Sequence, residues 1–210
     1  MLCGSATELT WEQDNLDAII QGWYPGAQGG KAIADIIFGA ANPQGKLLVT
    51  FYKTMDELPS FEDYSMKGRT YRYMTQEPLY PFGYGLSYTD FVYSKVEFVG
   101  IPDVKKGVEI TFTVRNAGKM DGTETVQVYV KAKRENTPNA QLKGIKKLDL
   151  KAGEEKALSI KLPPEAFMLF NEDGIAEYVA EGYEISIGGS QPDQRSCELT
   201  GRKPQRLRID

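Results

Sequence analysis

Residues 78–91 read PLYPFGYGLSYTDF and place two prolines, two glycines and five aromatic side chains within fourteen positions. Each proline fixes its own φ and restricts the residue before it, whereas Gly83 and Gly85 permit backbone angles that the flanking aromatic residues avoid. A flexible tether would be rich in glycine and serine, but these rings offer apolar area that has to be buried. The stretch therefore predicts a rigid connector, packed as a seam between two differently patterned halves.

The residues before this connector are patterned as strand, helix and strand. Residues 17–24 form a short, mostly apolar run closed by a Pro-Gly pair, which predicts a buried strand. Isoleucines at three- and four-residue spacing after Gly29 predict a helix that ends near Gly39. Residues 46–52 predict a second strand, so this order implies a parallel pair with a right-handed crossover. One such unit cannot cover both faces of a parallel sheet, which makes residues 1–90 the tail of a larger α/β domain.

Period-two alternation dominates residues 91–210. The expected strands are residues 95–100, 108–115, 124–131, 157–162 and 183–188. About seven short strands over a hundred residues is typical of an immunoglobulin-like sandwich. The two prolines at 163 and 164 exclude a central strand and predict a crossover loop or one helical turn. The predicted fold class is therefore an α/β remnant followed by an all-β sandwich.

Composition removes several classes of function. The formal net charge of −4 and the pI near 5.1 argue against a nucleic-acid partner. No apolar run approaches the roughly 18 residues that span a bilayer, so no membrane association is expected. The chain has no histidine, which excludes a Ser-His-Asp triad and a histidine-based zinc site. We expect no cofactor and no metal.

The cysteines and the first ten residues do not identify the cellular compartment. Cys3 and Cys197 are the only cysteines, which excludes a disulfide framework, and no bridge between them is expected. The opening MLCGSATELT lacks the basic, long-apolar and small-residue layout of a signal peptide. A secreted parent could carry its signal upstream of these residues, so the compartment stays open.

The connector also resembles a known family. PLYPFGYGLSYT closely resembles the segment that joins the α/β sandwich domain to the fibronectin type III-like domain in glycoside hydrolase family 3. Residues 17–30 and 34–50 resemble the last βα part of that α/β sandwich domain. Residues 114–118, 121–129 and 142–144 are similar to strands of the family's C-terminal β-sandwich. The resemblance covers nearly the whole chain and keeps the family's order.

The resemblance implies the C-terminal portion of a retaining, exo-acting β-glycosidase, a β-xylosidase or β-glucosidase that hydrolyses O-glycosidic bonds of plant-type oligosaccharides. GRTYRY at residues 68–73 is more similar to the β-xylosidase and arabinosidase-like members. In the family, the nucleophile Asp lies in an N-terminal barrel domain, and the acid/base Glu lies upstream of the region where this chain begins. We therefore expect no catalytic residue in this chain, which is predicted to be inactive alone.

The same resemblance implies the partners and the domain boundaries. The partners are a β-linked oligosaccharide or aryl glycoside, bound through the parent enzyme, and the barrel domain. The exposed edge of a truncated sheet favours self-association, so a homodimer is one expected form. The predicted boundaries are 1–90 for the end of the α/β sandwich domain with its connector and 91–210 for the fibronectin type III-like domain.

Two residues before the connector are candidates for substrate binding. Arg69 and Tyr71 carry a guanidinium and an aromatic face, which suit the hydroxyl and C–H groups of a sugar. The alternative is an arginine-tyrosine stack inside the seam. The nearby Tyr80, Phe82 and Tyr84, which need covering, favour that alternative.

The loop at residues 25–30, PGAQGG, lies between the expected strand and helix, where backbone N–H groups can bind anions. It lacks the spacing of a dinucleotide fingerprint and the lysine of a phosphate loop, so a structural turn is favoured. The resembling family usually reads Gly-Gln-Glu-Gly-Gly here. Because Ala27 and Gln28 depart from that pattern, no role of the family's acidic residue is carried over.

Two other classes of function stay open. A free-standing carbohydrate-binding or adhesion module would expose a row of aromatic rings, drawn from Tyr129, Tyr178 and Tyr183, on its sandwich. A small autonomous enzyme would use Glu62 or Asp63, with a raised pKa, as one of two carboxylates. Retaining glycoside hydrolysis needs such a pair about 5 Å apart.

Overall fold

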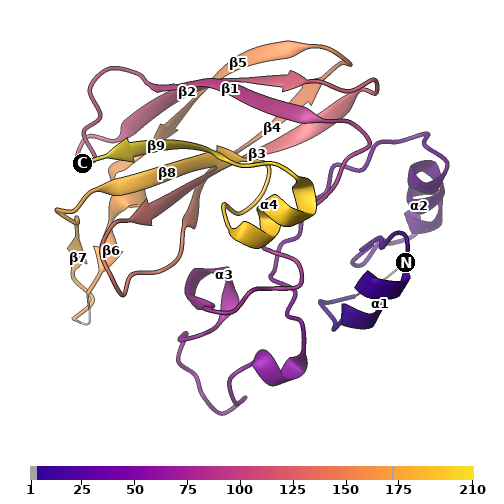
Figure 1. Ribbon diagram of the computed structural model, residues 1–210, viewed down its shortest axis with the longest axis horizontal. Helices are drawn as coiled ribbons and strands as arrows, with labels where there is room; N and C mark the ends of the chain where they lie inside the picture. The colour runs from indigo at the N-terminus through magenta and orange to yellow at the C-terminus, as the bar shows by residue number, and fades with distance from the viewer. Residues whose placement is uncertain (1–3, 172) are drawn as a thin grey trace.

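Two antiparallel sheets form the C-terminal half of the computed structural model, which describes residues 4–171 and 173–210 (Figure 1). The first sheet has the order β1-β2-β5, with bounds Phe91–Phe98, Val108–Asn116 and Glu155–Leu162. The second has the order β4-β3-β8-β9, with bounds Gln141–Leu150, Gly122–Ala132, Tyr183–Gly188 and Gln205–Ile209. These strands of the described residues make a two-layer sandwich, so the predicted all-β architecture is confirmed.

The core of the sandwich lies between the two layers. Alternate residues of β2 from Val108 to Val114 are no more than 2% exposed, and they face buried valines of β3 and Ile185 and Ile187 of β8. The period of two places every second side chain on the inner face, which is what the alternation predicted. Full burial of one such aliphatic side chain stabilises the fold by about 1.5–3 kcal/mol.

The period-two pattern missed three segments of the C-terminal half, although the family resemblance placed residues 142–144, which lie in β4, in a strand. β4 carries three lysines on a largely solvated strand at the edge of its sheet, and β9 is a short edge strand with two arginines. α4 (Gln194–Thr200) follows β8 and ends at Gly201, whose φ is +65°. Polar edge strands and short helices carry weak hydrophobic patterns, because only part of their surface is buried.

Small elements complete this half. The 3-10 turn η2 (Pro164–Phe167) is the single helical turn predicted after the paired prolines. β6 (Leu169–Phe170) and β7 (Ala176–Glu177) pair as a short hairpin outside both sheets.

The N-terminal half is built from short helices and extended loops. Its helices are α1 (Thr10–Asn15), α2 (Gly29–Ile37), η1 (Met55–Glu57) and α3 (Thr70–Tyr73). α2 confirms the predicted helix, and the backbone passes through Gly39 at a φ of +73° just after its end. In Figure 1, α1 and α2 lie beside one end of the sandwich and α3 lies below it.

The two strands predicted in this half are wrong. Neither residues 17–24 nor residues 46–52 form a strand in the described part of the chain, and the expected parallel pair is not formed there. Phe51 makes only an isolated antiparallel bridge to Tyr80, and Trp23 has a φ of +50°, outside the extended region. Leu47 and Phe51 exchange backbone hydrogen bonds with residues 79–84 of the connector, so the neighbour of residues 46–52 is an antiparallel loop and not the expected parallel strand.

A second, smaller core joins the halves. It consists of Leu9, Phe51, Leu79 and Tyr80, and Leu199 of α4 packs against it. The last helix of the chain therefore covers part of the N-terminal half, as Figure 1 shows for α4 between the sandwich and α3.

No helix of the described residues combines the length and the apolarity needed to cross a bilayer. The prediction for a Cys3–Cys197 pair falls on residue 3, which lies outside the described residues, while Cys197 is half-buried in α4.

Candidate functional site

The connector is clamped to the sandwich by one buried amide. The Nε2 atom of Gln127, a residue 2% exposed on β3, donates hydrogen bonds to the carbonyl oxygens of Gly83 (2.9 Å) and Gly189 (2.8 Å). The hydroxyl of Tyr129 donates to its Oε1 at 2.6 Å. A Cβ on Gly83 would lie 2.2 Å from that Oε1, and the φ of Gly83 is +77°. Position 83 therefore requires glycine both for its backbone angle and for the approach of the amide.

The aromatic rings of the connector are stacked, as a packed seam requires. The rings of Tyr80 and Tyr84 are parallel, with centroids 5.6 Å apart, and Phe51 meets Tyr80 edge-on at 6.1 Å. The ring of Phe82 is stacked on Tyr71 at 4.3 Å. Offset stacks and edge contacts of this kind stabilise beyond the burial of area, so they hold the connector against the rest of the N-terminal half.

Tyr71, one of the two candidate substrate-binding residues, lies in this seam. One face of its ring is stacked on Phe82, and its ring meets Tyr129 edge-on at 6.4 Å. Its hydroxyl accepts a hydrogen bond from the backbone N–H of Leu142 (3.3 Å), and its carbonyl accepts one from the side chain of Asn139 (3.1 Å). Tyr71 therefore holds the N-terminal half against the β3–β4 hairpin, and its role in substrate binding stays a prediction.

Arg69, the other candidate, organises a loop. Its Nε donates to the carbonyl of Ser65 (3.1 Å), and one terminal nitrogen donates to the carbonyls of Ser60 (2.9 Å) and Asp63 (2.6 Å). Arg69 and Tyr71 thus make contacts with different segments, and the expected arginine-tyrosine stack does not involve Arg69. The cation over an aromatic ring is that of Arg72, 5.5 Å from the centroid of Tyr73.

The two carboxylates considered for an autonomous enzyme are exposed. Glu62 and Asp63 lie in the loop that Arg69 orders. The backbone N–H of Ser65 donates to the Asp63 carboxylate at 2.8 Å and, with its hydroxyl and the Arg69 charge, lowers the pKa of Asp63. A general acid requires the opposite shift, so this site does not favour acid catalysis.

The loop at residues 25–30 is a turn. Gly26 has a φ of +64°, and the backbone N–H of Gly29 donates to its carbonyl at 3.2 Å. A Cβ on Gly29 would lie 2.5 Å from the Cβ of Pro25. The glycines therefore serve the entry into α2, which agrees with the structural interpretation of this loop.

A buried polar cluster at the seam was not predicted. Glu124 of β3 is 4% exposed, accepts a hydrogen bond from the hydroxyl of Tyr93 (2.7 Å) and lies 3.8 Å from the ammonium of Lys46. The same ammonium donates to the carbonyl of Gly85 at 2.9 Å. Burial, and then the charge of Glu124, raise the pKa of Tyr93 well above its usual value. In the sequence Glu124 is one of 29 acidic residues, and only its place at the start of an apolar alternating run distinguishes it.

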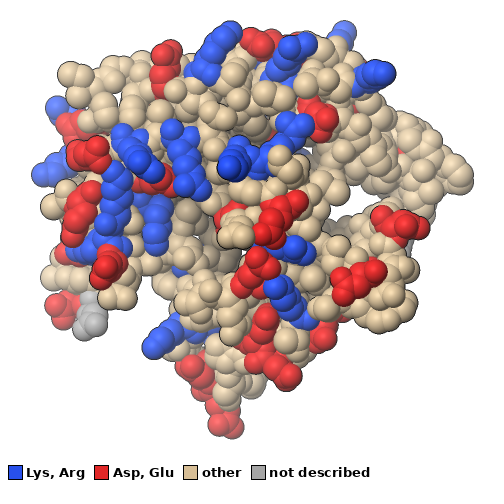
Figure 2. Space-filling model, in the orientation of Figure 1, with Lys and Arg blue, Asp and Glu red and all other residues tan. Residues whose placement is uncertain are grey.

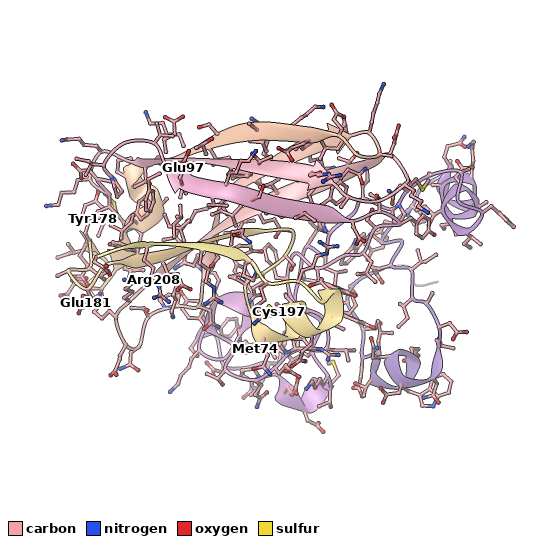
Figure 3. The ribbon with its side chains drawn as sticks, turned by 45° about the horizontal axis from the view of Figure 1, so that its top comes forward. Met74, Glu97, Tyr178, Glu181, Cys197 and Arg208 are labelled. Atoms are coloured by element: carbon pink, nitrogen blue, oxygen red, sulfur yellow. The ribbon has the colours of Figure 1, made fainter. Side chains whose placement is uncertain are left out.

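The aromatic row of a carbohydrate-binding module is not presented on the sandwich. Tyr129 and Tyr183 are 1% and 2% exposed, and the hydroxyl of Tyr183 accepts from the backbone N–H of Val179 (2.8 Å). Tyr178 is half-buried near the β6–β7 hairpin, at the far end of the sandwich from α4 (Figure 3). Two buried rings cannot form a sugar-binding platform, which argues against that function.

Charged side chains on the visible face are largely paired. Figure 2 shows lysines and arginines gathered over β8 and β9, with acidic groups among them. Arg206 and Arg208 both contact Glu184 at 3.3 Å, and Lys133 pairs with Asp210. Among residues 4–171 and 173–210, no group of three or more cysteine, aspartate or glutamate side chains is placed to hold a metal ion.

Comparison with known protein families assigns both halves. The model of the glycosyl hydrolase family 3 C-terminal domain matches residues 1–88, and that of the fibronectin type III-like domain matches residues 124–191. The order of these matches agrees with the predicted fold class, a partial α/β domain followed by a β-sandwich.

Individual relatives give the same result. A xylan 1,4-beta-xylosidase from Xylanibacter ruminicola is 42% identical over 94% of this chain, which is 23% of the relative. A periplasmic beta-glucosidase from Salmonella typhimurium is 36% identical over 95% of this chain and 28% of its own length. The crystal structure of a beta-glucosidase from Listeria innocua in complex with isofagomine superposes with a TM-score of 0.81 at 26% identity, covering 99% of this chain and 30% of that one. The chain thus spans roughly a quarter of the length of the curated relatives it matches.

Proposed function

Because this chain belongs to glycoside hydrolase family 3, with that family's C-terminal domain in residues 1–88 followed by a fibronectin type III-like domain, we propose that it is the C-terminal portion of a retaining, exo-acting β-glycosidase. The parent is a β-xylosidase or β-glucosidase that cleaves O-glycosidic bonds of plant-type oligosaccharides. In this proposal the chain supports catalysis without supplying the reacting groups.

The observation that carries the proposal is the apolar surface of the N-terminal half. Tyr24, Phe38 and Leu48 are 84%, 86% and 71% exposed, and Trp11 and Ile37 are also largely exposed. Ile37 is the last residue of α2, and this helix stands apart from the sandwich in Figure 1. Exposed large apolar groups in such number mark a surface that packs against another body. We propose that this body is the remainder of the α/β domain and the barrel.

The chemistry of the acidic residues supports an upstream catalytic pair. Retaining hydrolysis requires two carboxylates about 5 Å apart, one of them protonated as an acid. Asp63 is exposed with a lowered pKa. Glu124 is buried but already engages Tyr93 and Lys46. We therefore propose that the nucleophile Asp and the acid/base Glu belong to the preceding region of the parent.

The division of the chain is part of the same proposal. We propose an α/β segment with its connector at 1–90 and a fibronectin type III-like domain at 91–210; the start of β1 at Phe91 supports this boundary. The proposed partners are the barrel domain and a β-linked oligosaccharide or aryl glycoside bound by the parent. Self-association into a homodimer through the apolar N-terminal surface is the form proposed for the isolated chain.

A chimera tests the proposal. In the Xylanibacter ruminicola relative, the segment that matches this chain is replaced by this chain, and hydrolysis of nitrophenyl β-xyloside and β-glucoside is measured. We expect the chimera to be active and the isolated chain to be inactive. The variant Asp63→Asn should leave the chimera active.

Two results would contradict the proposal. One is a folded chimera without turnover. The other is turnover by the isolated chain that Glu62→Gln or Asp63→Asn abolishes, which would establish the autonomous enzyme. Retardation of the isolated chain in a glycan-containing affinity gel, without any contribution to the chimera's activity, would support a binding module instead.

A further inference from the structure

A cavity of about 320 Å³ opens beside the connector. Its wall is formed by the connector, the end of β8, α4 and the segment that leads into β9, together with Lys46 and Glu124. We call it the connector cavity. Cys197, which also lines it, is labelled on α4 in Figure 3. The volume lies at the lower end of the range of about 300–1,000 Å³ that is typical of small-molecule sites.

The buried ion pair in this wall is not closed by a hydrogen bond. The Lys46 ammonium lies 3.8 Å from Oε2 of Glu124, whereas a charge-assisted hydrogen bond joins such atoms at about 2.7–2.9 Å. Tyr93 donates to the other oxygen, Oε1, and no donor of the described residues reaches Oε2. The ammonium carries three donors, of which the carbonyl of Gly85 takes one at 2.9 Å.

Both members of this pair keep contact with the cavity. The side chains of Lys46 and Glu124 are 15% and 6% exposed, and both line the connector cavity. Oε2 is not among the enclosed oxygens that lack a hydrogen-bond partner. Each charged group therefore has a hydrogen-bonding position that a molecule in the cavity can use.

The other charged groups of the wall are paired or exposed. Arg202 lies 2.8 Å from Asp90 and donates to the carbonyl of Phe91 at 2.9 Å. Lys203 is exposed on the segment before β9, where water and salt screen its charge. Lys46 and Glu124 are thus the charged groups that select a ligand in this cavity.

A ligand with a single charge does not match this pair. An ammonium group that approaches Oε2 also approaches the Lys46 ammonium, and a carboxylate that approaches Lys46 also approaches Glu124. Like charges at such distances repel more strongly in a poorly solvated site than in water. An α-amino acid carries its ammonium and its carboxylate on one carbon atom. Its ammonium can donate to Oε2 while its carboxylate accepts from Nζ of Lys46.

The rest of the wall suits an apolar side chain. Leu86, Phe91 and Val92 line the cavity, and Leu86 and Val92 are 59% and 41% exposed. Covering such apolar surface is favourable because it is removed from water. A molecule that is charged at one end and apolar at the other therefore matches both parts of the wall.

We propose that the connector cavity binds the zwitterion of an α-amino acid with an apolar side chain, with its ammonium on Oε2 of Glu124 and its carboxylate on the ammonium of Lys46. Lys46 belongs to the N-terminal half and Glu124 to β3, so the bound ligand bridges the two halves of the chain. The inference goes beyond the proposed glycosidase parent and does not depend on it, because every group that holds the ligand belongs to this chain.

Calorimetric titration of the full chain with three matched probes tests the proposal. L-Leucine carries both charged groups, 3-methylbutylamine lacks the carboxylate, and 4-methylpentanoate lacks the ammonium. L-Leucine should bind saturably. Each of the other two should bind at least about tenfold more weakly, because it loses a charge-assisted hydrogen bond and meets an uncompensated like charge. The proposal is overturned if leucine gives no saturable binding or if either of the other probes binds as tightly.

A substitution that fills the cavity locates the binding. Ser190 is a half-buried residue of the wall, and Ser190→Phe should weaken leucine binding at least about tenfold by occupying the ligand's space. The matched control is Ser159→Phe, which places the same ring at an exposed position of β5 outside the cavity. It should leave leucine binding within about twofold. Equal binding by Ser190→Phe and the unsubstituted chain would overturn the proposed location.

Replacement of Lys46 gives a readout that a purely structural role would not. In Lys46→Met, Oε2 no longer faces a protein ammonium, so 3-methylbutylamine should bind more tightly than in the unsubstituted chain while leucine binds more weakly. The ratio of leucine affinity to amine affinity should fall at least about tenfold. A general loosening of the fold weakens both ligands alike, so parallel losses in Lys46→Met would also overturn the proposal.

Discussion

The buried amide of Gln127 should be the most sensitive single point of the seam. Replacing it by leucine in Gln127→Leu removes hydrogen bonds to the carbonyls of Gly83 and Gly189 and the one donated by the Tyr129 hydroxyl. Each such bond contributes about 1 kcal/mol net, and a partner left buried and unpaired costs more. We expect a loss of about 3–5 kcal/mol in the free energy of unfolding, a large share of the roughly 5–15 kcal/mol that stabilises a domain.

Urea unfolding followed by far-UV circular dichroism measures this loss. Gln205→Leu is the matched control, because Gln205 lies on β9 of the same sheet with an exposed side chain, and its change should stay within about 0.5 kcal/mol. Gly83→Ala should destabilise by a similar amount as Gln127→Leu, since its Cβ would displace the amide and its φ is positive. A loss below about 1 kcal/mol for Gln127→Leu would refute the argument that these three bonds hold the connector.

Three further predictions concern neighbouring groups. Burial raises the pKa of Tyr84 to about 12, so the stability it contributes is complete below the unfolded value near pH 10 and is lost as the pH rises through 12. In Tyr84→Phe the urea midpoint should decrease less between about pH 10 and pH 12 than it does in the unsubstituted chain. The same decrease in both proteins would contradict the contribution of Tyr84. Arg69→Gln should speed hydrogen exchange in residues 60–65 without lowering the urea midpoint, and equal exchange rates in both proteins would contradict the loop contacts. Lys46→Met leaves Glu124 buried without its cation and should lower the free energy of unfolding by about 3 kcal/mol. Lys31→Met, which removes one partner of an exposed pair, should lower it by less than about 0.5 kcal/mol. Equal losses for the two variants would contradict the importance of burial at Glu124.

Much of the C-terminal half was predictable because its signals are local. Alternation from Val108 to Val114 predicts a strand with one buried face, and the structure buries those positions. The helix after Gly29 was predictable for the same reason, since its spacing and its glycine stop are read from neighbours in the chain. Residues 17–24 show the limit of this reasoning. An apolar run becomes a strand only beside another strand, and that partner is not specified by the run itself.

The candidate site depended more on contacts between distant segments. The chemistry of Arg69 suited a sugar, but its donors are used by the carbonyls of its own loop. Glu124 looked like one of many solvated acids, yet the closure of the sandwich buries it against Tyr93 and Lys46. Burial and partner choice are properties of the packed chain, so composition could not identify either outcome.

The amino-acid sequence by itself determined the strand-forming periods, the helix α2 and the stiff aromatic connector, because proline, glycine and alternation act within a few residues. Only the tertiary structure decided which polar groups meet. Lys46 and Glu124 are far apart in the chain and line the same cavity because the connector is clamped to β3 beside the end of β8. The physical reason is that hydrogen-bond partners and buried cavities are set by long-range packing, which no local pattern encodes.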